Sequence, residues 1–142
     1  MRKEYDDMDP IERQNALAGI AECAADRIET APVDDYRRVA ETADGDPADW
    51  QDDDACRFCV IGALFRCARD LGAVTDEHGS EALTGDATEH MKSLGLLDDV
   101  EPWHSYDYLT GLLVKDPSGL IAAERLRGMA AALRTGIETA GA

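Results

Sequence analysis

The sequence contains few basic residues. Of its 142 residues, three are lysine and eleven are arginine, against nineteen aspartates and eleven glutamates, which gives a net charge of −16. A surface of this sign repels nucleic acid and anionic membranes and attracts basic partners, over a range that salt shortens. We therefore expect no direct binding to nucleic acid or to a membrane.

Long apolar segments are also absent from the sequence. No run approaches the ~20 apolar residues that a membrane-spanning helix requires. The first seven residues, Met-Arg-Lys-Glu-Tyr-Asp-Asp, do not have the apolar character of a secretory signal. The expected location is the cytoplasm, where the four cysteines would be reduced thiols.

Familiar catalytic motifs are missing as well. The chain has no glycine-rich phosphate loop and no G-x-S-x-G sequence. Carboxylates are so frequent that no pair of them stands out for acid–base chemistry. These observations favour a protein that is not an enzyme and that needs no cofactor.

The composition favours helices. Eight residues are aromatic and twenty-two are alanine, and helices that meet through alanine can approach closely. The length fits one domain with a modest core. The sequence predicts an all-α fold, a compact single-domain bundle of five or six helices spanning residues 1–142.

Two long helices have clear sequence signals. Asp9, Pro10 and Glu12 have the pattern of a helix N-terminus. After them, one apolar face repeats at helical spacing through Leu17, Ile20, Ala21, Ala24 and Ile28. Near the other end, Asp116 and Pro117 predict the start of a final helix. Its apolar face consists of Leu126, Met129, Ala130, Leu133 and Ile137.

Between these ends, a short helix is expected over 33–43, with Tyr36, Val39 and Ala40 inward, and a loop over 44–54. The next helix is expected over 55–71, starting after three aspartates, ending at Gly72 and lying at the centre of the fold. Its predicted buried residues are Cys59, Ile61, Leu64, Phe65 and Ala68. Asp86 indicates the start of a further helix to Leu94, and residues 103–114 fit a helix better than a strand.

Negative charge is concentrated in residues 41–54, which contain seven acids and no base. Duplex DNA presents one negative charge per ~1.7 Å of its axis, so a rigid array of carboxylates could occupy the groove of a nucleic-acid-binding protein. Glu22, Asp26 and Glu29 would extend the array if the first helix lay alongside. The expected partner-binding surface consists of Glu41, Asp44, Asp46, Asp49, Trp50, Asp52, Asp53 and Asp54.

Simpler explanations of the same residues stay open. The acidic stretch could be a solvated loop, and Trp50 could cover the edge of the core instead of anchoring a partner. The acidity could also reflect a GC-rich genome or a salty cytoplasm in a housekeeping protein. A general bias should spread acidic residues evenly, whereas residues 1–54 carry a net charge of −11 and residues 55–142 only −5.

Cys56 and Cys59 form a C-x-x-C pair. With Cys67 and a histidine at position 78, 90 or 104, they could hold zinc, or one thiol could serve as a nucleophile in a cysteine-dependent enzyme. Two observations count against both the zinc site and the cysteine nucleophile. Cys56 and Cys59 lie at the start of an apolar segment, and buried cysteine is common in protein cores. The three aspartates at 52–54 also oppose thiolate formation.

Trp50, the acidic run 52–54 and Cys59-Val-Ile-Gly-Ala-Leu64 form a pattern. It resembles that of a family of small bacterial and phage proteins of unknown function, in which a tryptophan and a short acidic insert precede a Cys-x-x-Gly-Ala-Leu helix. The resemblance covers about residues 10–135 and implies a small helical domain without a known activity. The preferred function is a non-enzymatic acidic protein that binds a basic, nucleic-acid-binding partner, in the manner of a phage inhibitor.

Overall fold

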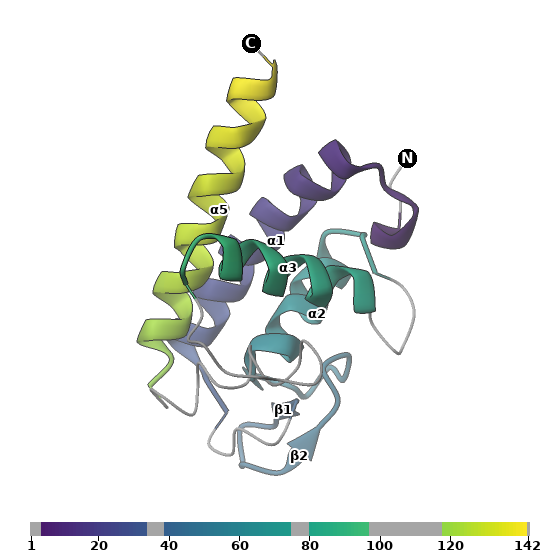
Figure 1. Cartoon of the computed structure of the whole chain (residues 1–142). Coiled ribbons are helices and arrows are strands. Elements are labelled where there is room, and N and C mark those ends of the chain that lie inside the picture. The colour runs from purple at the N-terminus through teal and green to yellow at the C-terminus, as the bar shows by residue number, and fades with distance from the viewer. Residues whose placement is uncertain (1–3, 34–38, 75–79, 97–117, 142) are drawn as a thin grey trace.

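The computed structural model describes residues 4–33, 39–74, 80–96 and 118–141, with side chains as far as Thr135. In these ranges it has four α-helices, one 3-10 helix and a three-stranded antiparallel sheet (Figure 1). The prediction of an all-α bundle of five or six helices is therefore wrong, although the fold is mostly helical. The elements are η1 (Tyr5–Asp7), α1 (Pro10–Thr30), β1 (Ala40–Glu41), β2 (Pro47–Ala48), β3 (Arg57–Phe58), α2 (Val60–Asp70), α3 (Glu81–Ser93) and α5 (Leu120–Gly141).

Helix α1 begins where the sequence predicts. The Asp9 carboxylate accepts from the Glu12 N–H at 2.8 Å, and the Glu12 carboxylate accepts from the Asp9 N–H at 3.1 Å, while Pro10 opens the helix. This reciprocal capping satisfies two N–H groups that the helix itself cannot. The predicted apolar face of α1 is confirmed, since all five of its residues are buried.

Helix α5 lies alongside α1 (Figure 1), and both helices contain buried alanines. Leu126, Met129, Ala130 and Leu133 of α5 are buried as predicted, and the Ile137 side chain lies outside the described residues. The predicted start at Asp116 and Pro117 also lies outside them. The first described turn of α5 follows Gly119, and its Leu120 N–H is 3.4 Å from the Ser118 hydroxyl.

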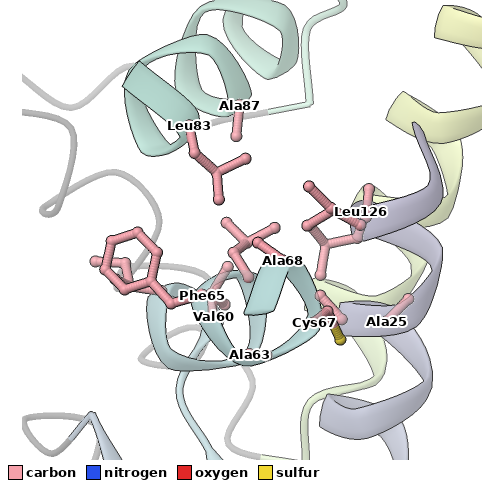
Figure 2. Close-up of a cluster of buried hydrophobic side chains, with 14 of the residues drawn as sticks. Ala25, Val60, Ala63, Phe65, Cys67, Ala68, Leu83, Ala87 and Leu126 are labelled. Carbon is pink, nitrogen blue, oxygen red and sulfur yellow. The ribbon is translucent and has the colours of Figure 1, made fainter. Parts of the chain in front are cut away.

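Helix α2 starts at Val60 and not at residue 55, and it packs mainly against α1. Its five predicted core residues are all buried. In Figure 2, Leu83 and Ala87 of α3 lie over Ala68 of α2, and Leu126 of α5 reaches the same cluster. Gly72 follows the helix with a φ of 81°, as expected for a C-terminal glycine.

A small sheet replaces the N-terminal part of that predicted helix. Strand β1 lies between β2 and β3, with Ala40 opposite Ala48 on one side and Phe58 on the other. The prediction of a helix over 33–43 is wrong at residues 40–41, where β1 lies; residues 34–38, including Tyr36, lie outside the described ranges. Val39 is exposed and Ala40 is buried. Likewise β2 interrupts the predicted loop 44–54.

Two residues at the start of α2, Cys59 and Gly62, explain how the helix meets the sheet. The Cys59 thiol accepts a hydrogen bond from the Gly62 N–H at 3.3 Å and so caps the helix. A Cβ on Gly62 would lie 2.2 Å from the carbonyl oxygen of Val39. Only glycine permits this approach, which brings the first turn of α2 against the segment that enters β1.

Helix α3 begins six residues earlier than predicted. Ser80, and not Asp86, caps it by accepting from the Leu83 N–H at 3.1 Å. The helix ends before Gly95, which has a φ of 71°. The predicted element at 103–114 lies outside the described residues.

Candidate functional site

Six of the eight residues expected to bind a partner form one exposed set, here called the aspartate surface. They lie in the β1–β2 turn and in the loop from β2 to β3, at the sheet end of the molecule (Figure 1). Within the part of the chain that the structure describes, none of the six carboxylates forms an ion pair with a basic side chain. The members are Asp44, Asp46, Asp49, Asp52, Asp53 and Asp54.

The two loops have defined local structure. In the β1–β2 turn, the Thr42 N–H donates to the Asp46 carbonyl at 2.9 Å, and Gly45 supplies a φ of 88°. In the following loop, the Asp52 carboxylate accepts from the Asp49 N–H at 3.0 Å. Short side chains that bond to nearby backbone in this way stabilise turns. The aspartate surface is therefore carried on ordered turns.

Two arginines of α2 hold the second loop through its backbone. Arg66 Nη1 donates to the carbonyl oxygens of Trp50 at 3.0 Å and Asp52 at 2.8 Å. Arg69 Nη1 donates to the Gln51 carbonyl at 2.8 Å. Because these guanidinium donors bond to carbonyls, they fix the loop without using its carboxylates.

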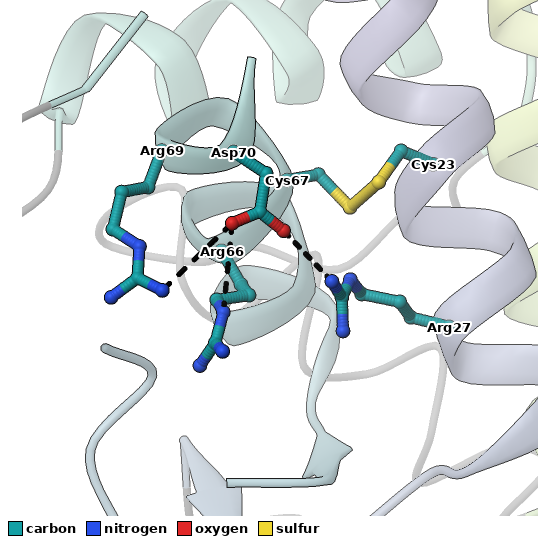
Figure 3. Close-up of a disulfide and its surroundings, with 6 residues drawn as sticks. All are labelled: Cys23, Arg27, Arg66, Cys67, Arg69 and Asp70. Carbon is teal, nitrogen blue, oxygen red and sulfur yellow. Dashed lines mark hydrogen bonds and ion pairs between the residues drawn. A yellow bond between two sulfur atoms is a disulfide. The ribbon is translucent and has the colours of Figure 1, made fainter. Parts of the chain in front are cut away.

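Asp70 gathers these arginines with a third one from α1 (Figure 3). Its carboxylate lies 2.8 Å from Arg27 Nη2 and 3.8 Å from both Arg66 Nε and Arg69 Nη2. The guanidinium groups of Arg27 and Arg66 also stack over the Phe58 ring, 5.4 and 5.8 Å from its centre. Burial and the nearby Arg69 charge lower the pKa of Arg66, but arginine stays charged in proteins.

Trp50 and Glu41 do not belong to the exposed surface, which corrects two of the expected site residues. Trp50 is 6% exposed, and its ring packs against Phe65 with 5.6 Å between ring centres. Glu41 is 0% exposed and lies in β1 opposite Arg57. Trp50 thus covers the core, as the alternative reading of this residue expected.

The acidic residues of α1 do not extend the aspartate surface. Arg127 of α5 bonds to Asp26 at 2.8 Å and also contacts Glu29, and Arg134 of α5 contacts Glu22. The hydrogen bonds that Arg127 donates to Asp26 and Glu29 raise the pKa of Arg127. These carboxylates are therefore used to join α1 to α5, and the expected extension is wrong.

The cysteines are arranged differently from the expectation of four reduced thiols. Cys23 of α1 and Cys67 of α2 form a disulfide with their Cα atoms 5.8 Å apart (Figure 3), so that expectation is wrong for these two. Cys56 is a free, exposed thiol, and Cys59 is free and buried. Burial raises the pKa of the Cys59 thiol, which keeps it protonated and a poor nucleophile.

The zinc set considered from the sequence is not assembled, because Cys67 is bonded to Cys23. No group of three or more His, Cys, Asp or Glu side chains in the described ranges is placed to hold a metal ion. His78 and His104 lie outside these ranges. Sequence reasoning missed Arg66 and Arg69 as site residues, although their i, i+3 spacing on a helix after the acidic loop was a usable signal.

None of the described helices combines the length and the apolar character needed to cross a membrane. No protein-family model, no curated protein and no solved structure matches the chain.

Proposed function

We propose that the protein is a non-enzymatic binding protein whose aspartate surface occupies a basic groove of a nucleic-acid-binding partner. The observation that carries this proposal is that α2 fixes the backbone of the loop from β2 to β3. Arg66 and Arg69 bond to three successive carbonyls, of Trp50, Gln51 and Asp52. The adjacent carboxylates are left exposed on a fixed backbone. A surface ordered before binding loses less entropy when the partner docks.

The acidic residues of α1 differ from those of the aspartate surface, and this difference supports the proposal over a uniform background of acidity. On α1, Glu22, Asp26 and Glu29 contact arginines of α5. On the aspartate surface, six carboxylates are exposed without such a partner among the described residues. Unpaired like charges on one surface repel each other, and a basic partner would relieve that repulsion.

The proposed setting is the cytoplasm, and the protein would act as an inhibitor that displaces nucleic acid, of the kind phages use against host defences. In a reducing cytoplasm the Cys23–Cys67 disulfide would be exposed to cellular thiols. The proposal does not depend on this bond, because the contacts that hold the loop come from Arg66 and Arg69.

The experiment is affinity capture from a host lysate with three immobilised proteins of equal concentration. One is the natural chain, and one carries Asp46→Asn, Asp53→Asn and Asp54→Asn. These three side chains accept no hydrogen bond from a described residue. The third carries Glu81→Gln, Glu89→Gln and Glu124→Gln, which removes the same charge from exposed helix positions.

The proposal predicts that the natural chain and the Glu81, Glu89 and Glu124 variant retain the same basic protein, and that high salt releases it. The Asp46, Asp53 and Asp54 variant should not retain this protein. Equal capture by both variants would assign the interaction to net charge alone. It would then favour the alternative in which the acidity is a background property.

A further inference from the structure

Two adjoining cavities lie along one side of α3, away from the aspartate surface. One, of about 210 Å³, is lined by η1, α1 and α3, and its polar residues include Arg13 and Asp86. The other, of about 180 Å³, lies between α1, α3 and α5 and includes Leu94 and Leu133. Both are lined by Gln14 and His90, so the two cavities adjoin at these residues, and we call them the two lobes of one groove.

The groove is formed because α3 is held at its two ends. At the N-terminal end, the Ser80 hydroxyl donates to the Asp6 carboxylate at 2.5 Å, and the Tyr5 hydroxyl donates to Asp86 at 2.7 Å. Beyond the C-terminal end, Arg125 of α5 donates to the Leu96 carbonyl at 2.6 Å. The groove lies between these attachments.

The first lobe offers an open carboxylate oxygen. The Tyr5 hydroxyl and Arg13 Nη1, at 3.7 Å, both approach Oδ2 of Asp86, which leaves Oδ1 able to accept another hydrogen bond. The Asp86 side chain is 34% exposed. Arg13 is largely committed elsewhere, because its Nε and Nη2 donate to the carbonyls of Tyr5 and Asp6 at 3.2 and 2.9 Å.

The middle and the second lobe differ in character. The side chains of Gln14 and His90 form no hydrogen bond or ion pair with any residue in the described ranges. Each can accept and donate hydrogen bonds. The second lobe adds the apolar side chains of Leu94, Ala132 and Leu133. The groove therefore runs from a carboxylate, past two hydrogen-bonding groups, to an apolar end.

We propose that this groove binds a small organic cation, an ammonium group with a short branched apolar tail. The ammonium would donate to Asp86 Oδ1 and Gln14, and the tail would cover Leu94 and Leu133. The net charge of −16 attracts cations to the surface. Each lobe is smaller than the ~300–1,000 Å³ of an ordinary small-molecule site, which suits a ligand of only a few non-hydrogen atoms. The site is independent of the partner-binding proposal.

The test is an amide NMR titration at fixed ionic strength with three probes of the same shape: 3-methylbutylamine, 3-methylbutan-1-ol and 3-methylbutanoate. The amine should produce saturable shifts in α1, α3 and α5 around Gln14 and His90, with a Kd on the order of millimolar for so small a ligand. The alcohol should bind about tenfold more weakly because it lacks the charge, and the carboxylate should not saturate.

Variants then locate the site. Asp86→Asn keeps an acceptor for Tyr5 and should weaken amine binding about tenfold. Glu89→Gln makes the same charge change at an exposed position on the same helix and should leave amine binding unchanged. If Asp86→Asn does not fold, Gln14→Ala and the comparison of the three probes on the natural chain decide the question. Equal binding of amine and alcohol, saturable binding of the carboxylate, or equal effects of the Asp86 and Glu89 variants would overturn the proposal.

Discussion

Arg66 Nη1 donates to the carbonyl oxygen of Asp52 at 2.8 Å, and not to the carboxylate of that residue. A guanidinium beside a run of aspartates would ordinarily pair with them. Here the bond to the backbone positions the loop and leaves the Asp52 side chain to accept from the Asp49 N–H. The cation thus orders an acidic surface without neutralising it by direct contact.

This relationship predicts the effect of Arg66→Lys. A lysine keeps the charge but cannot reproduce the planar fork of donors. We expect faster amide hydrogen exchange in residues 49–55 and a loss of about 1 kcal/mol in the free energy of unfolding. Arg125→Lys is the control, because it weakens a bond to the Leu96 carbonyl elsewhere. If both variants change exchange in 49–55 equally, Arg66 does not hold the loop.

Gly62→Ala should be strongly destabilising. The new Cβ would lie 2.2 Å from the Val39 carbonyl oxygen, so α2 or the segment entering β1 must move. We expect a loss of about 2–3 kcal/mol in chemical denaturation. Gly85→Ala, where a Cβ would meet nothing within 4 Å inside α3, should be neutral or stabilising by about 0.5–1 kcal/mol. Similar losses in both variants would contradict the close approach.

Tyr5→Phe should change how stability depends on pH. Burial, followed by the hydrogen bond to Asp86, raises the pKa of Tyr5 above its ordinary value of about 10. Above pH 10 the unfolded chain releases this proton while the native protein retains it, so the unfolded state binds fewer protons and stability falls as pH rises. The natural chain should therefore lose stability between pH 9 and 11.

In the Tyr5→Phe variant this decline should be smaller, and stability at pH 7 should be lower by about 1 kcal/mol because the Asp86 hydrogen bond is lost. The measurement is a series of urea denaturation curves from pH 7 to 11. Parallel pH profiles for the two proteins would show that the Tyr5 proton is not retained on folding.

Reduction of the Cys23–Cys67 disulfide should destabilise the fold. The bond closes a segment with a sequence separation of 44 between α1 and α2, and opening it restores chain entropy to the unfolded state. We expect a loss of about 2–4 kcal/mol in the presence of a dithiol reductant. Cys56→Ser, at an exposed free thiol, should have little effect. Four titratable thiols in the unreduced, denatured protein would contradict the disulfide.

The sequence predicted those elements whose signals are local. The start of α1 depends on Asp9, Pro10 and Glu12, which lie within one turn, and the buried faces of α1 and α5 follow from helical spacing. The start of α2 could not be read in this way. Residues 55–59 lie in the same mostly apolar segment as the helix, but the N–H groups of Cys56, Phe58 and Cys59 bond to carbonyls that are distant in the sequence. These acceptors are Glu41, Ala31 and Val39.

The candidate site likewise contains features that the local sequence predicts and features that depend on distant residues. Six aspartates are exposed, as their charge predicts, because an unpaired carboxylate is costly to bury. The burial of Trp50 depends on Phe65, fifteen residues away in α2. The pairing of the α1 carboxylates depends on Arg127 and Arg134 in a helix about a hundred residues later. Such long-range contacts leave no periodic signal in the sequence.

The most direct test of the proposed function is competitive elution from DNA-cellulose loaded with host lysate. The account predicts that the natural chain elutes a small, specific set of basic proteins, as the Glu81, Glu89 and Glu124 variant also does. The Asp46, Asp53 and Asp54 variant should fail to elute them at the same concentration. Elution of the same proteins by both variants, or of none by the natural chain, would contradict the claim that the aspartate surface competes with nucleic acid.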